Sequence, residues 1–319
     1  MIPVAEPNLD GNELKYVVDC VKTGWISSIG SYVTKFENTF SRYCGMKHGI
    51  AVANGTVALH VALEALGIKK GDEVIIPSLT FVATANAVKY TGAKPVFVDS
   101  EPRTWNIDPE KIEEKITPRT KAIIPVHLYG HPCDMGRITE IAEKHDLAII
   151  EDAAEAHGAE YKGKKIGSLS AISCFSFYGN KILTTGEGGM CLTNDEKLVE
   201  KMRQLKDHGM SANRRYYHLQ MGYNYRLTNI QAAIGLAQLE KLEETIAIKR
   251  KNVQLYNSLL RNIKGITLPV EESWAKNVYW LYSILIEKDY KLKRDELMLK
   301  LKKEGIETRP FFLPLHQMP

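Results

Sequence analysis

The stretch Leu147-Ala148-Ile149-Ile150-Glu151-Asp152 decides the fold class, together with the run Phe175-Ser176-Phe177-Tyr178-Gly179-Asn180-Lys181 that follows it. The first stretch is apolar and ends in an acidic pair, as expected of a buried strand with polar side chains at its carboxyl end. The second belongs to an apolar strand that supplies a hydroxyl and then, after a Gly-Asn turn, a lysine. We therefore expect a carboxylate, a hydroxyl and an amine to converge.

Short β-branched runs alternate with helical stretches on the N-terminal side of Asp152. Strands are expected at residues 49–53, 73–76, 95–98, 122–126 and 147–150, and helices at residues 12–21, 31–44, 56–66, 80–90 and 135–145. Because parallel strands need crossover helices, this alternation predicts an α/β fold with a mostly parallel sheet covered on both faces. Ligands of such sheets bind beyond the carboxyl ends of the strands.

The C-terminal part has a different pattern. Residues 196–209 predict a helix, and residues 228–260 one long helix or two. Residues 281–286 then alternate like an antiparallel strand, and residues 294–303 form an amphipathic pattern that Gly305 ends. We predict a large domain of residues 1–239 and a smaller α+β domain of residues 240–319. The last residues, 312–319, suggest a loop with no terminal element, so we expect the small domain to be incomplete at its C-terminus.

Composition and charge exclude several classes of partner. The chain has 42 Lys+Arg against 38 Asp+Glu and no basic tract, which argues against nucleic acid and membrane surfaces as partners. Its five cysteines form no C-x-x-C pair, which is typical of reduced thiols in a cytosol and predicts no metal site. No stretch resembles a signal peptide or a membrane span. We expect a cytoplasmic protein.

The turn Ala53-Asn54-Gly55-Thr56 follows a predicted strand and opens a helix. The free amides of a helix N-terminus, a glycine and the Thr56 hydroxyl suit a phosphate group. The same residues suit an ordinary N-cap equally well. Neither G-x-G-x-x-G nor G-x-x-x-x-G-K-[ST] occurs, so the dinucleotide and P-loop fingerprints do not compete for this turn.

Lys181, Asp152 and Ser176 supply the three groups that a pyridoxal phosphate enzyme needs: an amine for covalent attachment, a carboxylate that keeps the pyridine nitrogen protonated, and a hydroxyl for the phosphate. The alternative is a solvated lysine and a helix-capping aspartate. Glu155 lies one helical turn after Asp152. Phe81 suits stacking on a planar heterocycle or a place in the core.

Two further motifs stay open. His127 and His131 are four residues apart, but Gly130 and Pro132 preclude a helix, so a metal-binding pair at that spacing is not expected. The segment 222–229 packs two amides, two tyrosines and an arginine ahead of a long helix. It suits either a capping loop or a loop that reaches a ligand, including one in a partner subunit.

In order and spacing, seven segments together resemble the DegT/DnrJ/EryC1/StrS family of pyridoxal-phosphate-dependent sugar aminotransferases. They are residues 54–59, 77–81, 126–130, 151–156, 175–181, 186–189 and 222–226. The resemblance spans essentially the whole chain. It implies the fold-type-I aminotransferase architecture and a homodimer with shared active sites at the interface.

The resemblance also implies a role for each matching residue. Lys181 corresponds to the attachment lysine and Asp152 to the partner of the pyridine nitrogen, and these two are the catalytic candidates. The other cofactor-binding candidates are Gly55, Thr56 and Ser176 at the phosphate, Phe81 on the ring, Glu155 near the phenolic oxygen, and Asn224 lent by the other subunit. Candidates for binding the substrate are Trp25, Ser27, His127, Tyr129, Arg226, Arg309 and His316. The wider family commonly has glutamine at Glu155 and serine at Asn54.

The implied activity is transfer of an amino group from glutamate to a nucleotide-linked 4-keto-6-deoxy sugar, with pyridoxamine phosphate as the second form of the cofactor. Within the family, residues 25–30, 179–181, 309–310 and 316–319 most resemble 4-aminotransferases of GDP-4-keto-6-deoxymannose, which serve O-antigen or other polysaccharide biosynthesis. The alternatives are a dTDP- or UDP-linked substrate, a sugar dehydratase, which has histidine in place of Lys181, and a non-catalytic regulatory module.

Overall fold

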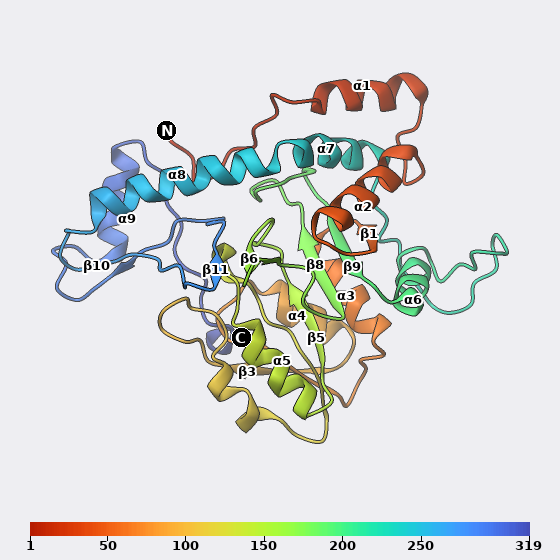
Figure 1. Ribbon diagram of the computed structural model, residues 1–319, viewed down its shortest axis with the longest axis horizontal. Coiled ribbons are helices and arrows are strands. Elements are labelled where there is room, and N and C mark those ends of the chain that lie inside the picture. Colours follow the sequence, from red (N-terminus) through yellow and green to blue (C-terminus); the bar gives the residue numbers. More distant parts are fainter.

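A seven-stranded sheet forms the centre of the molecule in the computed structural model, which describes all residues from 1 to 319 (Figure 1). The strand order is β1-β9-β8-β5-β4-β2-β3. Strands β3, β2, β4, β5 and β8 run parallel, and β9 and β1 complete one side in antiparallel pairing. The strands are β1 His48–Val52, β2 Glu73–Pro77, β3 Lys94–Val98, β4 Thr120–Ile123, β5 Ala148–Asp152, β8 Ile172–Ser176 and β9 Gly189–Thr193. The predicted fold class is confirmed.

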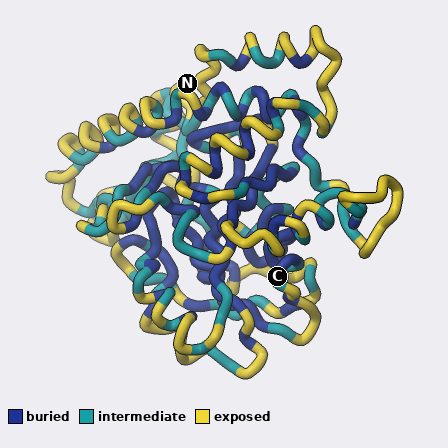
Figure 2. The backbone as a smooth tube through the Cα atoms, turned by 45° about the vertical axis from the view of Figure 1, so that its right-hand side comes forward, coloured by how far each residue is buried: buried dark blue, intermediate teal, exposed yellow.

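Helices cover both faces of this sheet, as the parallel strands require. They are α1 Glu13–Thr23, α2 Ser31–Tyr43, α3 Gly55–Ala65, α4 Ala83–Tyr90, α5 Met135–Lys144, α6 Glu196–Lys206 and α7 Asn229–Glu240, with 3-10 turns at Pro109–Lys111, Glu113–Lys115 and Leu128–Gly130. Each face has its own apolar core: Phe175 of β8 packs in one cluster with α2 and α7, and its neighbour Cys174 in the other with α3 and α6. Successive strand residues point to opposite faces, so a two-sided core needs a nearly continuous apolar strand. Figure 2 shows this interior as the buried centre of the chain.

The C-terminal region consists of two helices and short strands. Its elements are α8 Leu242–Leu260, β10 Ile266–Thr267, β11 Ala275–Lys276, β12 Leu285–Ile286 and α9 Arg294–Lys303. β10 pairs with β12, whereas β11 pairs with β6 (Glu160–Tyr161), which also pairs with β7 (Lys164–Lys165). The region is therefore hydrogen-bonded to the rest of the chain, and a domain boundary at residue 240 stays a prediction.

Two predicted elements differ from the structure. The strand expected over residues 281–286 is reduced to β12, because the preceding residues pack against the large core: Trp280 is buried there and Leu281 contacts it. The terminal run was expected to be only a loop, but it contains the 3-10 turn Leu315–Gln317. Leu315 is buried, and its amide donates to the Ser78 carbonyl, so this turn is docked on the loop after β2.

None of the helices combines the length and apolarity that a membrane span needs.

Candidate active site

Three segments meet closely at the N-terminus of α3. A Cβ atom on Gly55 would lie 2.6 Å from Cβ of Ser176 at the end of β8, and one on Gly189 would lie 2.4 Å from the Asn54 carbonyl oxygen. Both positions therefore require glycine. Asn54 is the N-cap: its Oδ1 accepts from the Val57 amide at 3.0 Å.

The cap leaves the first amides of α3 without intrahelical acceptors, as at every helix start. These are the amides of Gly55 and Thr56, and the Ser176 hydroxyl lies directly beside them. The predicted N-cap is confirmed, and it is compatible with a free anion-binding end, which stays a prediction. The donors fit a phosphate group.

Asp152 ends strand β5 and is 5% exposed. Its Oδ2 accepts from the Thr84 hydroxyl at 2.8 Å, and its Oδ1 accepts from the Ala154 amide at 3.3 Å. Burial raises the pKa of this carboxyl, against the lowering effect of those donors and of Lys181. A carboxylate buried with so little positive charge around it suits a ligand that brings a protonated nitrogen.

Lys181 follows the tight turn after β8, where its amide donates to the Tyr178 carbonyl at 2.9 Å. Its side chain is 10% exposed, and Nζ lies 3.7 Å from Oε1 of Glu155. Burial lowers the pKa of the Lys181 amine, and Glu155 and Asp152 oppose that shift. A lysine held in this way is closer to a neutral, nucleophilic amine than a lysine on the surface.

Glu155 is buried beside the lysine and is bonded to the backbone of Tyr129. The Tyr129 amide donates to Oε2 of Glu155 at 2.7 Å, from a residue with φ of +52°. That left-handed conformation is uncommon for a tyrosine, and it aims the amide at the carboxyl. Burial raises the pKa of Glu155 to about 7, although Lys181 favours its ionised form.

Phe81 and His316 lie where the loop after β2 meets the terminal run, of which His316 is a member. Phe81 is 55% exposed with its ring centroid 5.8 Å from that of Phe312, and the His316 ring is 3.1 Å from the Ser78 hydroxyl. Tyr129 lies beneath, where its hydroxyl accepts from the Phe312 amide at 3.2 Å. An exposed phenyl ring in this position is free to stack on a ligand.

Three of the other substrate candidates are exposed, away from the lysine. Arg309 pairs with Glu307 and contacts no residue of the site. Trp25 and Ser27 occupy the loop between α1 and α2, where their carbonyl oxygens accept from the side chain and the backbone amide of Asn229, at 2.7 and 2.6 Å. Asn229 is buried at the start of α7 and holds this loop in place.

Asn224 and Arg226 are also outside the buried group. Oδ1 of Asn224 accepts from Arg226 at 2.9 Å, and Arg226 pairs with Asp207 at 2.9 Å. The intervening Tyr225 carbonyl accepts from the Ala53 amide at 2.8 Å, so the segment runs along the end of β1. The chain that leads into it projects from the body beside α6 (Figure 1). Asn224 is exposed and makes no bond to Lys181 or Asp152.

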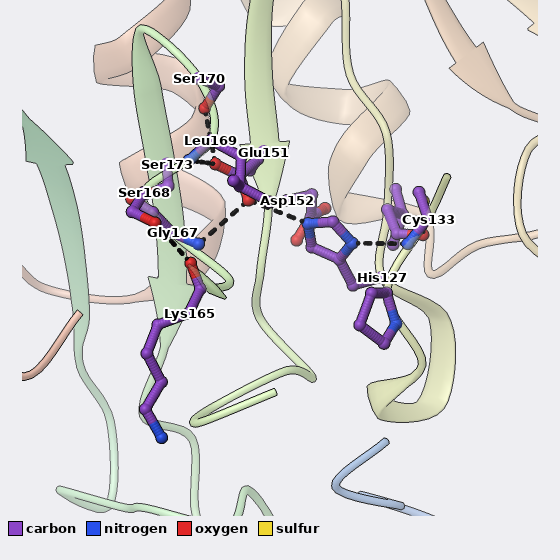
Figure 3. Close-up of polar contacts among 12 residues, drawn as sticks. His127, Cys133, Glu151, Asp152, Lys165, Gly167, Ser168, Leu169, Ser170 and Ser173 are labelled. Carbon is purple, nitrogen blue, oxygen red and sulfur yellow. Dashed lines mark hydrogen bonds and ion pairs between the residues drawn. The ribbon is translucent and has the colours of Figure 1, made fainter. Parts of the chain in front are cut away.

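The structure corrects the prediction for His127, which was expected to face a substrate. His127 is fully buried; its Nδ1 accepts from the Cys133 amide at 3.0 Å, so its Nε2 donates to Glu151 at 3.2 Å (Figure 3). Glu151 also accepts from Gly167, Leu169 and Ser170 at 2.8–3.0 Å. With both ring nitrogens used inside the protein, His127 fixes the end of β5 and has no free atom for a ligand.

Sequence reasoning missed Thr84 and Trp280 near this site, and it included Asn229 only as one of the two amides of segment 222–229. Thr84 donates to Asp152, Trp280 covers Lys181, and Asn229 holds the loop of Trp25. Their partners are 68, 99 and 204 residues away in the chain, and no local sequence pattern predicts contacts over such separations.

The profile of the DegT/DnrJ/EryC1/StrS aminotransferase family matches residues 7–319. The chain belongs to this family. Three GDP-perosamine synthases are similar to it over the whole chain: 54% identical in Caulobacter vibrioides and 50% in Escherichia coli O157:H7, each with 86% of the relative covered, and 44% in Vibrio cholerae, with 87% covered.

Solved structures agree with this assignment. A sugar aminotransferase of Streptococcus pneumoniae in its PLP form superposes with a TM-score of 0.93 at 29% identity, over 98% of this chain and 85% of that one. DesI, solved with its TDP-sugar product, superposes with a TM-score of 0.90 at 32% identity, over 96% and 78%. The family member described here is a pyridoxal-phosphate-dependent sugar aminotransferase, and the donors at α3 and β8 and the carboxyl group at the end of β5 fit that cofactor.

Proposed function

We propose that the protein transfers the amino group of glutamate to carbon 4 of GDP-4-keto-6-deoxymannose, forming GDP-perosamine and 2-oxoglutarate. The observation that carries this proposal is the 44–54% identity to three GDP-perosamine synthases over the full chain. The presence of Lys181 argues against the dehydratase alternative. The buried Asp152 and Glu155 and the nearly buried Lys181 argue against a purely structural module, because charges held away from water cost stability and cluster mainly at functional sites.

The cofactor would be held by residues of three elements. The Gly55 and Thr56 amides and the Ser176 hydroxyl would bind its phosphate, Asp152 would face its ring nitrogen, and Phe81 would stack on its ring. When bound, pyridoxal phosphate supplies an electron sink that stabilises negative charge on the carbon being deprotonated. Asp152, oriented by the hydrogen bond from Thr84, would keep the ring nitrogen protonated.

Lys181 is the catalytic base and acid. Its Nζ takes the proton from the α-carbon of glutamate and, in the second half of the reaction, delivers a proton to carbon 4 of the sugar. The lowered pKa of the amine favours the first step, and Glu155 at 3.7 Å holds the ammonium that results. Positioned proton transfer of this kind contributes about 10²–10⁴-fold to the rate.

The sugar nucleotide would bind at the exposed side of this group. Tyr129 and His316 border it within the chain, while Trp25, Ser27, Arg226 and Arg309 are surface residues that would contact the nucleotide or its phosphates. The two arginines carry the positive charge that a diphosphate requires.

The active unit is proposed to be a homodimer in the cytoplasm, with a place in O-antigen or related polysaccharide biosynthesis. Large apolar side chains exposed on α1, the loop after it and the projecting segment support a covering partner. They include Leu14 (74% exposed), Trp25 (55%), Ile29 (68%), Tyr216 (75%) and Met221 (83%). Asn224 and Arg226 follow that projecting segment, and in the proposed dimer they would complete the neighbour's site.

The test is a substrate comparison with purified, cofactor-loaded protein. GDP-4-keto-6-deoxymannose and glutamate should give 2-oxoglutarate in equal amount to an amino sugar, whose amine NMR places on carbon 4. dTDP- and UDP-linked 4-keto sugars should react at least about tenfold more slowly, a difference of about 1.4 kcal/mol in transition-state binding. Faster turnover of either competitor would overturn the GDP-sugar assignment while leaving the aminotransferase assignment intact.

A further inference from the structure

Trp280 makes two contacts with the lysine turn. Its ring lies under the Lys181 amine, with Nζ 3.5 Å from the ring centroid. Its Nε1 donates to the Asn180 carbonyl at 2.8 Å. Trp280 comes from the C-terminal region and is 5% exposed, so it reaches the large core from outside and closes over the lysine.

Neighbouring contacts fix the indole in this place. Tyr129 stacks on it with ring centroids 6.2 Å apart, and the Tyr129 amide binds Glu155. The amine therefore lies close to both an aromatic face, at 3.5 Å, and a carboxyl group, at 3.7 Å. An aromatic face attracts a cation and offers nothing to a neutral amine beyond apolar contact.

The titratable groups that face Lys181 are few. Glu155 and Asp152 come from β5 and the residues that follow it, and His157 lies beyond them, buried among Phe40, Phe175 and Phe177 with no hydrogen-bond partner for its ring nitrogens. Burial and the Lys181 charge keep the pKa of His157 low, at about 3, so it adds no charge near neutral pH. Glu155, Asp152 and the Trp280 ring are the groups that stabilise an ammonium at Lys181.

We propose that Trp280 is a positioning residue for the catalytic lysine: its ring stabilises the Lys181 ammonium whenever the amine is not attached to the cofactor, and its indole N–H fixes the turn that carries the lysine. This proposal rests on the proposed catalytic role of Lys181. Two variants of Trp280 distinguish the two contacts. Trp280→Phe keeps an aromatic face but removes the N–H donor, whereas Trp280→Leu keeps apolar bulk and removes both.

The first experiment uses the apoprotein, so it does not depend on activity. The rate at which acetic anhydride modifies Lys181, located by mass spectrometry, is measured against pH to obtain the pKa of the amine. Trp280→Leu should lower that pKa by about one unit, the size expected of a desolvated cation–π contact, and Trp280→Phe should leave it nearly unchanged. Trp274→Leu is the matched control, since Trp274 packs on Tyr161 and His131 instead and should have no effect. An unchanged or raised pKa in Trp280→Leu would overturn the ring's role.

The second experiment addresses the turn and remains decisive where Trp280→Leu does not fold. Hydrogen exchange of the Lys181 amide, which donates to Tyr178, should accelerate at least about fivefold in the Trp280→Phe apoprotein as the local opening equilibrium rises. Exchange at the wild-type rate would refute the anchoring role. In the cofactor-loaded protein, Trp280→Phe should lower the single-turnover rate constants of both half-reactions and leave KM for the sugar nucleotide within about twofold of wild type. If the wild-type protein showed no transaminase activity but the Lys181 pKa shifted as expected in the apoprotein variants, the result would count only against the proposed function.

Discussion

The lysine pocket and the loop of Asn224 differ in how complete they are within one chain. Asp152 and Glu155 are buried, the Lys181 side chain is only 10% exposed, and each of the three is held by neighbours of its own chain. Asn224 is exposed, and its side-chain oxygen accepts only from Arg226 two residues away. One half of the candidate site is thus preorganised by folding, and the other half is presented on the surface.

This difference indicates a division of labour. The proposed chemistry depends on side chains whose pKa values are shifted by burial and by fixed neighbours. In a single chain, only the interior provides such surroundings. Binding a sugar nucleotide requires access, so we expect the residues for it in exposed loops, which a second subunit would complete in the proposed dimer.

Lys181→Ala should have the largest effect, a loss of turnover of at least about 10⁴-fold, because it removes the group that moves the proton. The variant should stay folded and still bind the cofactor noncovalently through the phosphate cradle. Steady-state assays and circular dichroism measure the two outcomes, with the exposed Lys164→Ala as control. Ordinary turnover by Lys181→Ala would remove the lysine from the mechanism.

Asp152→Asn should slow the glutamate half-reaction by about 100-fold or more, the scale seen when one preorganised polar group is lost from a reacting centre. Asparagine keeps the shape and can still accept from Thr84, but it has no charge to hold the ring nitrogen protonated. Single-turnover absorbance measurements give the rate. A rate within a few-fold of wild type would place the aspartate away from the ring nitrogen.

Mixing two inactive proteins tests whether the halves belong to different chains. Lys181→Ala and Asn224→Asp each disable one half, so a heterodimer of the two would contain one intact site. After full subunit exchange, half of the dimers are mixed and each has one good site, so activity should return to roughly a quarter of wild type. Native mass spectrometry verifies the exchange. Verified heterodimers without activity would mean that Asn224 serves its own chain.

Asn229→Ala should weaken sugar-nucleotide binding while leaving the lysine pocket intact. Its side chain accepts from the Tyr32 and Val33 amides and donates to the Trp25 carbonyl, and a Cβ on Gly30 would lie 2.3 Å from it. Losing these bonds frees the loop of Trp25 and Ser27. We expect KM for the sugar nucleotide to rise about tenfold with the glutamate half-reaction unchanged. An equal loss in both half-reactions would show a general loss of structure.

The sequence was sufficient to predict the pocket's main residues because they follow from strand ends. Asp152, Ser176 and Lys181 lie at or just beyond the carboxyl ends of adjacent strands, which the apolar runs mark. Thr84 and Trp280 could not be predicted, since their contacts depend on how distant elements pack. A polar residue after a strand end is equally suited to a ligand or to an internal partner. His127 was misassigned for this reason: only the fold shows that Glu151 and Cys133 use both of its nitrogens.

Glu155→Gln should have the smallest effect, on stability. Folding raises the pKa of Glu155 to about 7 from the usual 4.5, so between those values the folded state binds more protons than the unfolded state. Stability therefore falls as pH rises through this window, and the loss is complete above pH 7. Glutamine has no proton to lose, so the two apoproteins should melt alike near pH 4 and the variant should melt a few degrees higher at pH 8. Thermal unfolding at several pH values measures this, with the exposed Glu244→Gln as control. If the melting temperature of Glu155→Gln at pH 8 equalled that of wild type, the Lys181 ion pair would fully offset the cost of burying Glu155. The interior half of the site would then cost the protein no stability.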